Sequence, residues 1–120
     1  MKRDMELIRK ILINLETRDG AEAIQQEYAP EQIQHHNWLI LNAGLAEGTE
    51  MTSSDNIDPV AHLFALNWAG QEFLDMARDE GRWKQAKDKA KELGGAVSFA
   101  GFKAILTVLM EQAIKHVMGP

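Results

Sequence analysis

Histidine side chains are the first candidates for chemistry in this sequence, because two of its four histidines, His35 and His36, are adjacent. On a helix, neighbouring residues point about 100° apart, so this pair cannot easily bind one metal ion. The sequence contains no His-x-x-x-His pair and no cysteine, so it predicts neither a helical histidine site nor a thiolate zinc site. We therefore expect His36 to be a half-buried core residue and His35 to be exposed, with no metal and no cofactor bound.

Other residue patterns do not predict catalysis either. No serine lies in a nucleophile-elbow pattern, and no glycine-rich phosphate loop follows a predicted strand. Gly94-Gly95 is more simply a helix break, and the carboxylates of Asp79 and Glu80 lie where the chain turns. Carboxylates at a turn are ordinary solvated side chains. We therefore expect a protein that is not an enzyme and has no catalytic residues.

The composition of the chain is that of one globular domain. It has 120 residues, of which 45% are hydrophobic, and a net charge of −5. No apolar run is long enough to span a membrane, and the first apolar run is too short for a signal peptide. The lack of cysteine is typical of cytosolic proteins. We therefore expect a cytoplasmic protein that does not bind membranes.

Caps and apolar spacing predict two helices in the first third of the chain. Asp4 is a favourable N-cap for a first helix, which residues 18–20 end. Pro30 is a favourable first residue for another helix, and Gly44 is its expected left-handed terminator. Residues 21–29, between the two helices, leave two alternatives open: a short strand or one helical turn.

A β-hairpin is predicted to follow. Residues 45–51 form its first strand, residues 52–59 are a loop by composition, and alternation over residues 60–66 forms its second strand. Asn67 is positioned to cap the next helix, which runs from Ala69 to about Arg78. The long polar tip of this hairpin is the wing of the predicted fold.

Two more helices complete the chain, one from Trp83 to Leu93 and a last one that Ser98 caps and that runs to about Met118. Residues 105–110 of the last helix are apolar on nearly every side, and such a helix needs cover on more than one face. Either the preceding helix or a second copy of the chain supplies this cover. If a homodimer forms, a two-fold contact of the last helix is the simplest geometry. The predicted dimer-interface residues are Ile105, Val108, Leu109 and Met110.

The order helix, strand, polar loop, strand, helix is that of the second half of a winged helix. The sequence therefore predicts an α+β fold. Residues 1–80 form a winged-helix-like core of helices and a β-hairpin wing. Residues 81–120 form a C-terminal helical extension of the same domain.

Three segments carry recognisable motifs: Met1–Leu12 begins Met-Lys-Arg-Asp-Met, His36–Leu45 ends Ala-Gly-Leu, and Leu66–Asp75 reads Leu-Asn-Trp-Ala-Gly-Gln-Glu-Phe-Leu-Asp. Together with Trp83 and the Lys-rich helix ending in Gly94-Gly95, they resemble a family of short uncharacterised proteins of bacteria, phages and prophages. The chain departs from the family pattern, which has Leu, Lys, Thr and His, at Asn37, Trp38, Asn67 and Gln71 respectively. The resemblance implies a winged-helix fold with added C-terminal helices, a mobile-element context and no established activity.

The charge pattern argues against the DNA reading that such a fold suggests. Residues 21–80 contain eleven acidic residues and one basic residue, Arg78, whereas residues 81–120 sum to +4. Affinity for DNA comes mostly from Lys and Arg on phosphates, and the predicted reading helix, residues 30–43, has neither. The acidic middle could instead bind a basic partner or the basic C-terminal region of another copy, or simply be a solvated surface.

The three tryptophans suggest where a partner would bind. Trp68 is expected in the core, and Trp83 is expected to fasten its helix to the fold. Trp38, flanked by polar residues, either is exposed and anchors a partner or packs under the wing. We therefore predict a non-enzymatic regulatory or interaction protein of phage or prophage type, with a DNA-binding transcriptional regulator as the alternative. The predicted partner-binding residues are Gln34, His35, Trp38, Glu47, Glu50, Asp55 and Asp58.

Overall fold

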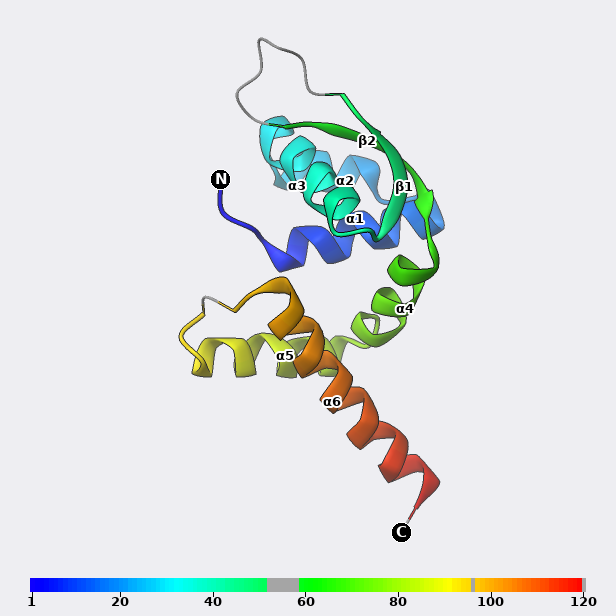
Figure 1. The fold of residues 1–120 in the computed structure, drawn as a ribbon, viewed down its shortest axis with the longest axis vertical. Coiled ribbons are helices and arrows are strands. Elements are labelled where there is room, and N and C mark those ends of the chain that lie inside the picture. Colours follow the sequence, from blue (N-terminus) through cyan, green and yellow to red (C-terminus); the bar gives the residue numbers. More distant parts are fainter. Residues whose placement is uncertain (52–58, 96, 120) are drawn as a thin grey trace. The chain divides into compact units, whose positions relative to one another are not determined.

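The structure is a computed structural model that describes residues 1–51, 59–95 and 97–119 (Figure 1). These residues form six helices and one two-stranded antiparallel sheet, so the predicted α+β class is confirmed. The chain divides into two compact units. Unit 1 comprises residues 1–74, and unit 2 comprises residues 75–120.

Unit 1 begins with three helices, α1 (Met5–Thr17), α2 (Ala21–Glu27) and α3 (Pro30–Asn42). The predicted cap of α1 is confirmed, because the carboxylate of Asp4 accepts hydrogen bonds from the first backbone N–H groups of the helix. Helix α2 decides between the two alternatives for residues 21–29 in favour of a helix. Its Ala, Glu and Gln residues have high helix propensity, which explains why a helix of only seven residues forms.

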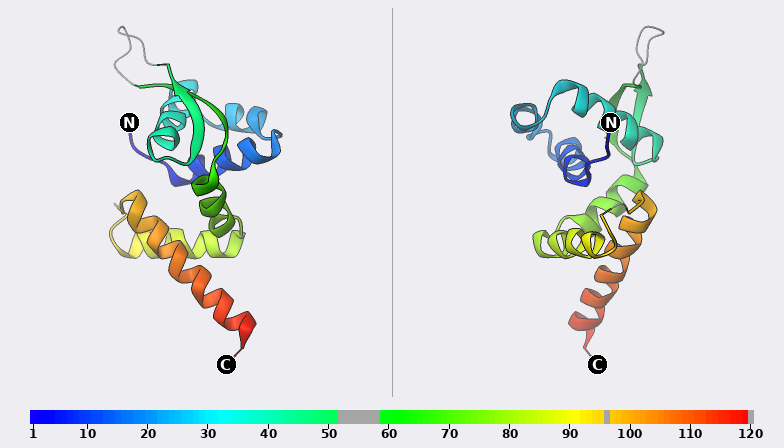
Figure 2. Two further views of the ribbon diagram at one scale, coloured as in Figure 1. Left: turned by 45° about the vertical axis from the view of Figure 1, so that its right-hand side comes forward. Right: turned by 90° about the vertical axis from the view of Figure 1, so that its left-hand side faces the viewer.

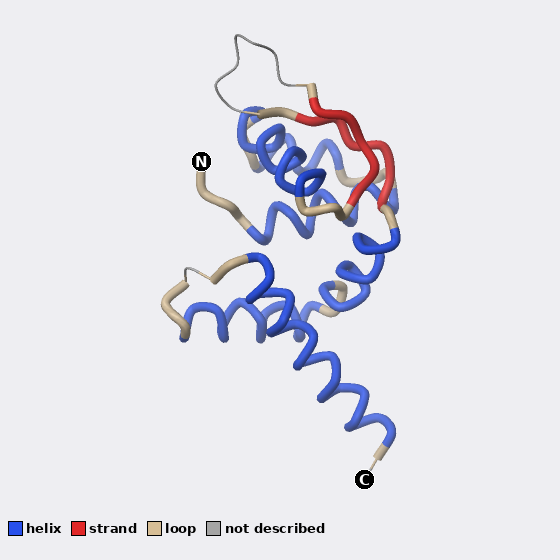
Figure 3. The backbone as a smooth tube through the Cα atoms, in the orientation of Figure 1, coloured by secondary structure: helices blue, strands red, loops and turns tan. Residues whose placement is uncertain are grey.

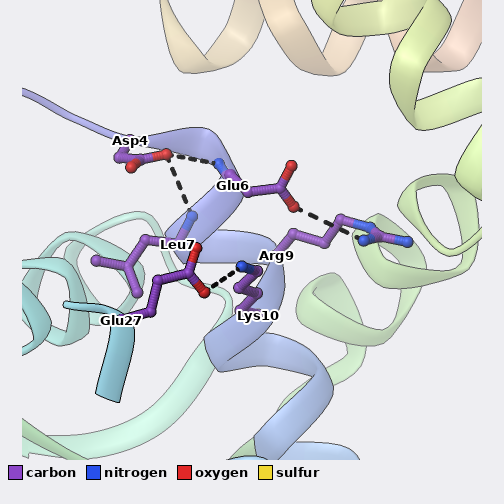
Figure 4. A network of polar contacts seen from close by, with 6 residues as sticks. All are labelled: Asp4, Glu6, Leu7, Arg9, Lys10 and Glu27. Atoms are coloured by element: carbon purple, nitrogen blue, oxygen red, sulfur yellow. Dashed lines mark hydrogen bonds and ion pairs between the residues drawn. The ribbon is translucent and has the colours of Figure 1, made fainter. Parts of the chain in front are cut away.

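Polar contacts hold the first turns of α1 (Figure 4). The Arg9 guanidinium lies 3.8 Å from the Glu6 carboxylate on the same helix. The Lys10 ammonium lies 2.7 Å from the Glu27 carboxylate, so this ion pair connects α1 to the end of α2. The hydrogen bond to Glu27 raises the pKa of Lys10, because it favours the charged form of the lysine.

The hairpin consists of β1 (Ala46–Glu50) and β2 (Ala61–Leu66), which pair antiparallel with an irregularity between Glu47 and Gly48. Both strands contact α3, and β2 also contacts α1, so the hairpin covers these helices (Figures 1 and 2). Ala61 and Leu63 face inward, whereas His62 and Phe64 are exposed. The larger side chains whose alternation predicted this strand, such as His62 and Phe64, therefore lie on the solvent-exposed face of β2. The predicted wing tip, residues 52–58, lies outside the described residues.

Helix α4 (Trp68–Ala77) starts in a tight junction at the base of the hairpin. Asn67 caps it as predicted, since its Oδ1 accepts a hydrogen bond of 2.8 Å from the Gly70 N–H. The Asn67 Nδ2 also donates to the Gly44 carbonyl oxygen at 2.7 Å. Gly44 has the predicted left-handed conformation, with φ 76°. A Cβ on Gly70 would lie 1.9 Å from the Leu45 carbonyl oxygen, so only glycine fits this junction.

Unit 2 contains α5 (Glu80–Glu92) and α6 (Phe99–Met118), which pack against each other and are capped by Asp79 and Ser98. Trp83 on α5 lies against Phe102 on α6, with ring centroids 5.1 Å apart, and both side chains are buried. The tube in Figure 3 shows that α6 continues beyond its contact with α5. The core of this unit therefore covers only part of the length of α6.

Candidate functional site

Three predicted partner-binding residues form one cluster in unit 1. The Trp38 Nε1–H donates a hydrogen bond of 3.2 Å to the Glu50 carboxylate, and the Trp38 ring is stacked beside the His35 ring with centroids 6.2 Å apart. Helix α3 supplies His35 and Trp38, and the end of β1 supplies Glu50. Packing of the hairpin on α3 therefore assembles these side chains, which we call the Trp38 cluster.

Trp38 itself is half-buried. Its contacts with His35 and Glu50 explain why it is not fully exposed, because the indole packs beside the end of β1. Gln34 is exposed one turn before Trp38 on the same face of α3, and Glu47 is exposed at the other end of β1 from Glu50. The remaining predicted partner-binding residues lie outside the described part of the chain; these are Asp55 and Asp58.

His35 is half-buried, and the prediction that it is exposed is wrong. Its ring lies between the ring of Trp38 and that of His36, whose plane is turned by 81°. The His35 Nδ1 is buried and has no hydrogen-bond partner among the described residues. A buried polar atom without a partner costs free energy, and the ring contacts with Trp38 and His36 oppose this cost.

His36 is fully buried, more deeply than the sequence predicts. Its Nε2 accepts a hydrogen bond of 2.8 Å from the Asp4 N–H, and its Nδ1–H donates to the Gln32 carbonyl oxygen at 2.7 Å. Because an N–H can only donate and a carbonyl can only accept, this pattern requires the neutral ring. Burial lowers the pKa of His36 and so favours the same form. Both ring nitrogens are engaged, so His36 is a structural residue that connects α1 to α3.

Trp68 corrects another prediction, because its side chain is 82% exposed and does not lie in the core. Asn67 starts α4 immediately before it, which leaves Trp68 at the first position of the helix, while Phe73 and Leu74 are fully buried. Trp83 is buried at 1% exposure, as its predicted role requires. On α4 the side chains that face inward are the apolar pair one turn after Gly70, Phe73 and Leu74. This pair is the sequence signal that could have shown that α4 does not need Trp68 in the core.

The predicted dimer-interface residues on α6 differ in exposure. Ile105, Leu109 and Met110 are half-buried, and Val108 is 51% exposed. Leu106, in the middle of the same apolar run, is fully buried. The preceding helix therefore covers one side of this run, and the other side still faces solvent.

Charge and metal-binding capacity limit what these surfaces can do. Helix α3 and strand β1 contain the carboxylates of Glu31, Glu47 and Glu50 and no lysine or arginine. The described residues contain no group of three or more His, Asp or Glu side chains placed to hold a metal ion. Within the same residues, no helix has both the length and the apolar character needed to cross a bilayer. The Trp38 cluster is therefore an acidic, partly aromatic surface suited to binding a cationic group.

Comparison with known proteins identifies the family of this chain. The sequence model of the family described as "Hypothetical protein (DUF2513)" matches residues 2–96. A protein of Haemophilus influenzae described as an uncharacterized protein is 29% identical over 119 residues, which cover 95% of this chain and 99% of that protein. No solved structure matches the chain. Because the family model matches most of its length, the chain belongs to this family of hypothetical proteins, as the resemblance of its motifs predicts.

Proposed function

We propose that this protein is a non-enzymatic regulatory or interaction protein of phage or prophage type, and that unit 1 binds a basic segment of a partner protein. The predicted winged-helix-like core is supported by the order of elements in unit 1, α1, α2, α3, β1 and β2, and by the contacts of α3 with both strands of the hairpin. In helix-turn-helix proteins the second helix of the motif is the reading element. Here the corresponding helix, α3, carries half of the Trp38 cluster.

The observation that carries this proposal is the pairing of an aromatic ring with a carboxylate in the Trp38 cluster. A lysine or arginine side chain over a tryptophan ring gains a cation–π attraction when it lies within about 6 Å of the ring centroid. The Glu50 carboxylate lies at the edge of the same ring, 3.2 Å from Nε1. A carboxylate has about four lone-pair sites, so Glu50 can accept a charge-assisted bond from the incoming cation as well as the bond from Trp38.

The same charges disfavour the alternative, a DNA-binding transcriptional regulator. Specific and non-specific DNA binding both depend on lysine and arginine contacts to phosphate, and α3 and β1 provide none. Gln34 and Asn37 are residue types that read adenine, but base contacts specify a site only after phosphate contacts position the protein. An acidic recognition helix and hairpin therefore fit a basic protein segment better than a duplex.

The proposal is tested by fluorescence anisotropy at a salt concentration of about 150 mM, where exposed charges more than about 8 Å apart are largely screened. The probes are a labelled oligolysine peptide and a labelled DNA duplex. We expect saturable binding of the peptide and, for the duplex, only binding weaker than about 1 µM, since specific DNA-binding proteins reach about 10⁻⁸ M or tighter. Sub-micromolar binding of the duplex would contradict the proposal and support the alternative.

Matched variants then locate the binding surface. Trp38→Ala and Glu50→Gln should each weaken peptide binding by about tenfold, the effect of losing about 1.4 kcal/mol. Trp68→Ala removes an exposed tryptophan outside the cluster, and Glu72→Gln removes an exposed carboxylate on α4, so both are controls and should bind normally. Equal losses in Glu50→Gln and Glu72→Gln would mean that binding depends on total charge, and the assignment to the Trp38 cluster would be wrong. Capture from a host lysate by the unmodified protein, compared with Trp38→Ala, would identify the partner.

A further inference from the structure

A groove runs along one side of the pair of helices in unit 2. Two adjoining hollows of about 370 Å³ and 410 Å³ form it, and they share Leu109 and Gln112. The first hollow has an apolar lining that includes Leu93, Ile105 and Val108. The second is lined by residues that include Arg82, Ala113 and Val117. Because the two hollows share these two lining residues and are both lined by α5 and α6, we treat them as one groove along the junction of the two helices.

This groove leaves apolar surface on α6 uncovered. Phe102 and Leu106 are buried, whereas Val108 and Val117, which line the groove, are 51% and 83% exposed. Ile105, Leu109 and Gln112 recur at spacings of three and four residues, so they lie on one face of the helix. Two packed helices bury only one side of each other, and a contiguous exposed apolar face usually marks an interaction site.

We propose that the groove holds α6 of a second copy of this chain, so that two pairs of α5 and α6 form a two-fold symmetric four-helix bundle. Four packed helices enclose an apolar core between them, and a two-fold contact buries the same surface of both copies. Ile105, Val108 and Leu109 of the predicted interface line the groove, whereas Met110 does not. The interface therefore extends along the groove toward Val117 instead of surrounding residues 105–110.

The charges at the rim favour a second copy over a strongly charged partner. Lys89 and Glu92 line the first hollow and form an ion pair of 3.7 Å, and Asp79 and Arg82 line the second. Each rim therefore carries one positive and one negative side chain, and its field does not select a partner of either sign. An apolar helix of low net charge fits such a groove. Helix α6 is itself such a helix, with Lys103, Glu111 and Lys115 as its only Lys, Arg, Asp or Glu residues.

Sedimentation velocity on the full-length protein tests the dimer. At a concentration on the order of tens of micromolar, we expect a species of about twice the chain mass of 13.5 kDa, as a two-fold dimer requires. Val108→Glu places a charge in the groove and should return the protein to the monomer mass. A single species of 13.5 kDa for the unmodified protein would overturn the proposal.

Ile114→Glu is the matched control for this experiment. Ile114 lies on the same helix, its exposure of 52% is within one percentage point of that of Val108, and it lines neither hollow. We expect Ile114→Glu to remain dimeric, and circular dichroism should show both variants folded, because an exposed side chain is replaced in each. Dissociation of both variants to the same extent would overturn the assignment to the groove.

A spin label supplies a second measurement that does not depend on a disruptive change. The chain has no cysteine, so Gln112→Cys, at one of the two positions shared by the hollows, gives one label per chain. Electron–electron dipolar coupling between labels is expected in the unmodified background and should disappear on adding Val108→Glu. If this coupling is absent from the labelled protein both without and with Val108→Glu, the proposal is overturned. Oligolysine binding by Val108→Glu should be unchanged, so this inference and the proposed function fail or succeed separately.

Discussion

Unit 1 carries twelve acidic and five basic side chains, whereas unit 2 carries six acidic and eight basic ones. The surplus of negative charge in unit 1 favours a partner of opposite charge and speeds its approach, but this advantage decreases as salt is added. The groove of unit 2 has a balanced rim and an apolar lining, so we expect its binding to depend on shape and to be affected little by salt. The two proposals therefore assign this chain two surfaces of different selectivity, one for a foreign partner and one for its own copy.

The units also differ in what holds each together. Unit 1 has polar connections between elements far apart in sequence, such as those of His36 to Asp4 and of Asn67 to Gly44. Unit 2 depends on a small apolar core around Trp83 and Phe102. A single substitution should therefore damage unit 2 most when it removes core volume, and unit 1 most when it disturbs a junction or a buried polar group.

The largest effect is expected from Trp83→Ala. Deleting a large aromatic side chain from a core costs about 3–5 kcal/mol of unfolding free energy, and Trp83 is buried against the Phe102 ring of α6. Trp68→Ala should change this free energy by less than about 0.5 kcal/mol, because the side chain is solvent-exposed. Urea unfolding followed by circular dichroism measures both. A larger loss for Trp68→Ala would reverse the assignment of core and surface tryptophans.

Gly70→Ala should have the next largest effect, and it tests the junction in unit 1. The added Cβ would meet the Leu45 carbonyl oxygen at 1.9 Å, so the backbone must move, which typically costs about 1–3 kcal/mol. Gly81→Ala in α5 is the control, because its nearest atom would be 3.3 Å away on the movable Asp79 side chain. Thermal melts should show a much smaller shift for Gly81→Ala. Similar shifts for the two variants would show that the junction is not tightly packed.

The smallest effect is a pH dependence due to His36. Because its pKa is lowered in the folded protein, the unfolded chain binds more protons just below the ordinary pKa of about 6.5. Stability is therefore complete above that pH and decreases as the pH falls from about 6.5 toward the folded pKa, by at most about 1.4 kcal/mol per pH unit. His36→Gln should be less stable near neutral pH but lose this dependence. Urea midpoints measured from pH 7.5 to 5, the window that brackets the free pKa of about 6.5, provide the check. An unchanged slope in His36→Gln would assign the dependence to other groups.

Much of the fold of this chain can be predicted from the sequence because its signals are local. Asp4, Asn67 and Ser98 cap helices as predicted, since a cap depends on a few neighbouring residues. The orientation of β2 and the exposure of Trp68 could not be read in this way. Alternation reveals a strand without stating which face the helices cover, and that choice depends on the packing of the whole unit.

The candidate site shows the same division between local and tertiary information. Trp38 could be chosen from its type and its polar neighbours. Its bond to Glu50, twelve residues away, arises only when the hairpin folds back on α3. The stacking that buries His35 arises in the same way, so the sequence predicts an exposed residue where the structure has a half-buried one.

The hairpin of unit 1 is closed at two levels: the Met51 N–H donates to the Val60 carbonyl oxygen at 2.9 Å, and Asn67 fastens the base to Gly44. Neither bond involves residues 52–58. The pairing of β1 and β2 is therefore fixed at both ends of the hairpin by bonds among the described residues. A strand pair fixed at both ends cannot slip in register without breaking one of these bonds, and a slip of one residue would turn every inward side chain of β2 to the solvent.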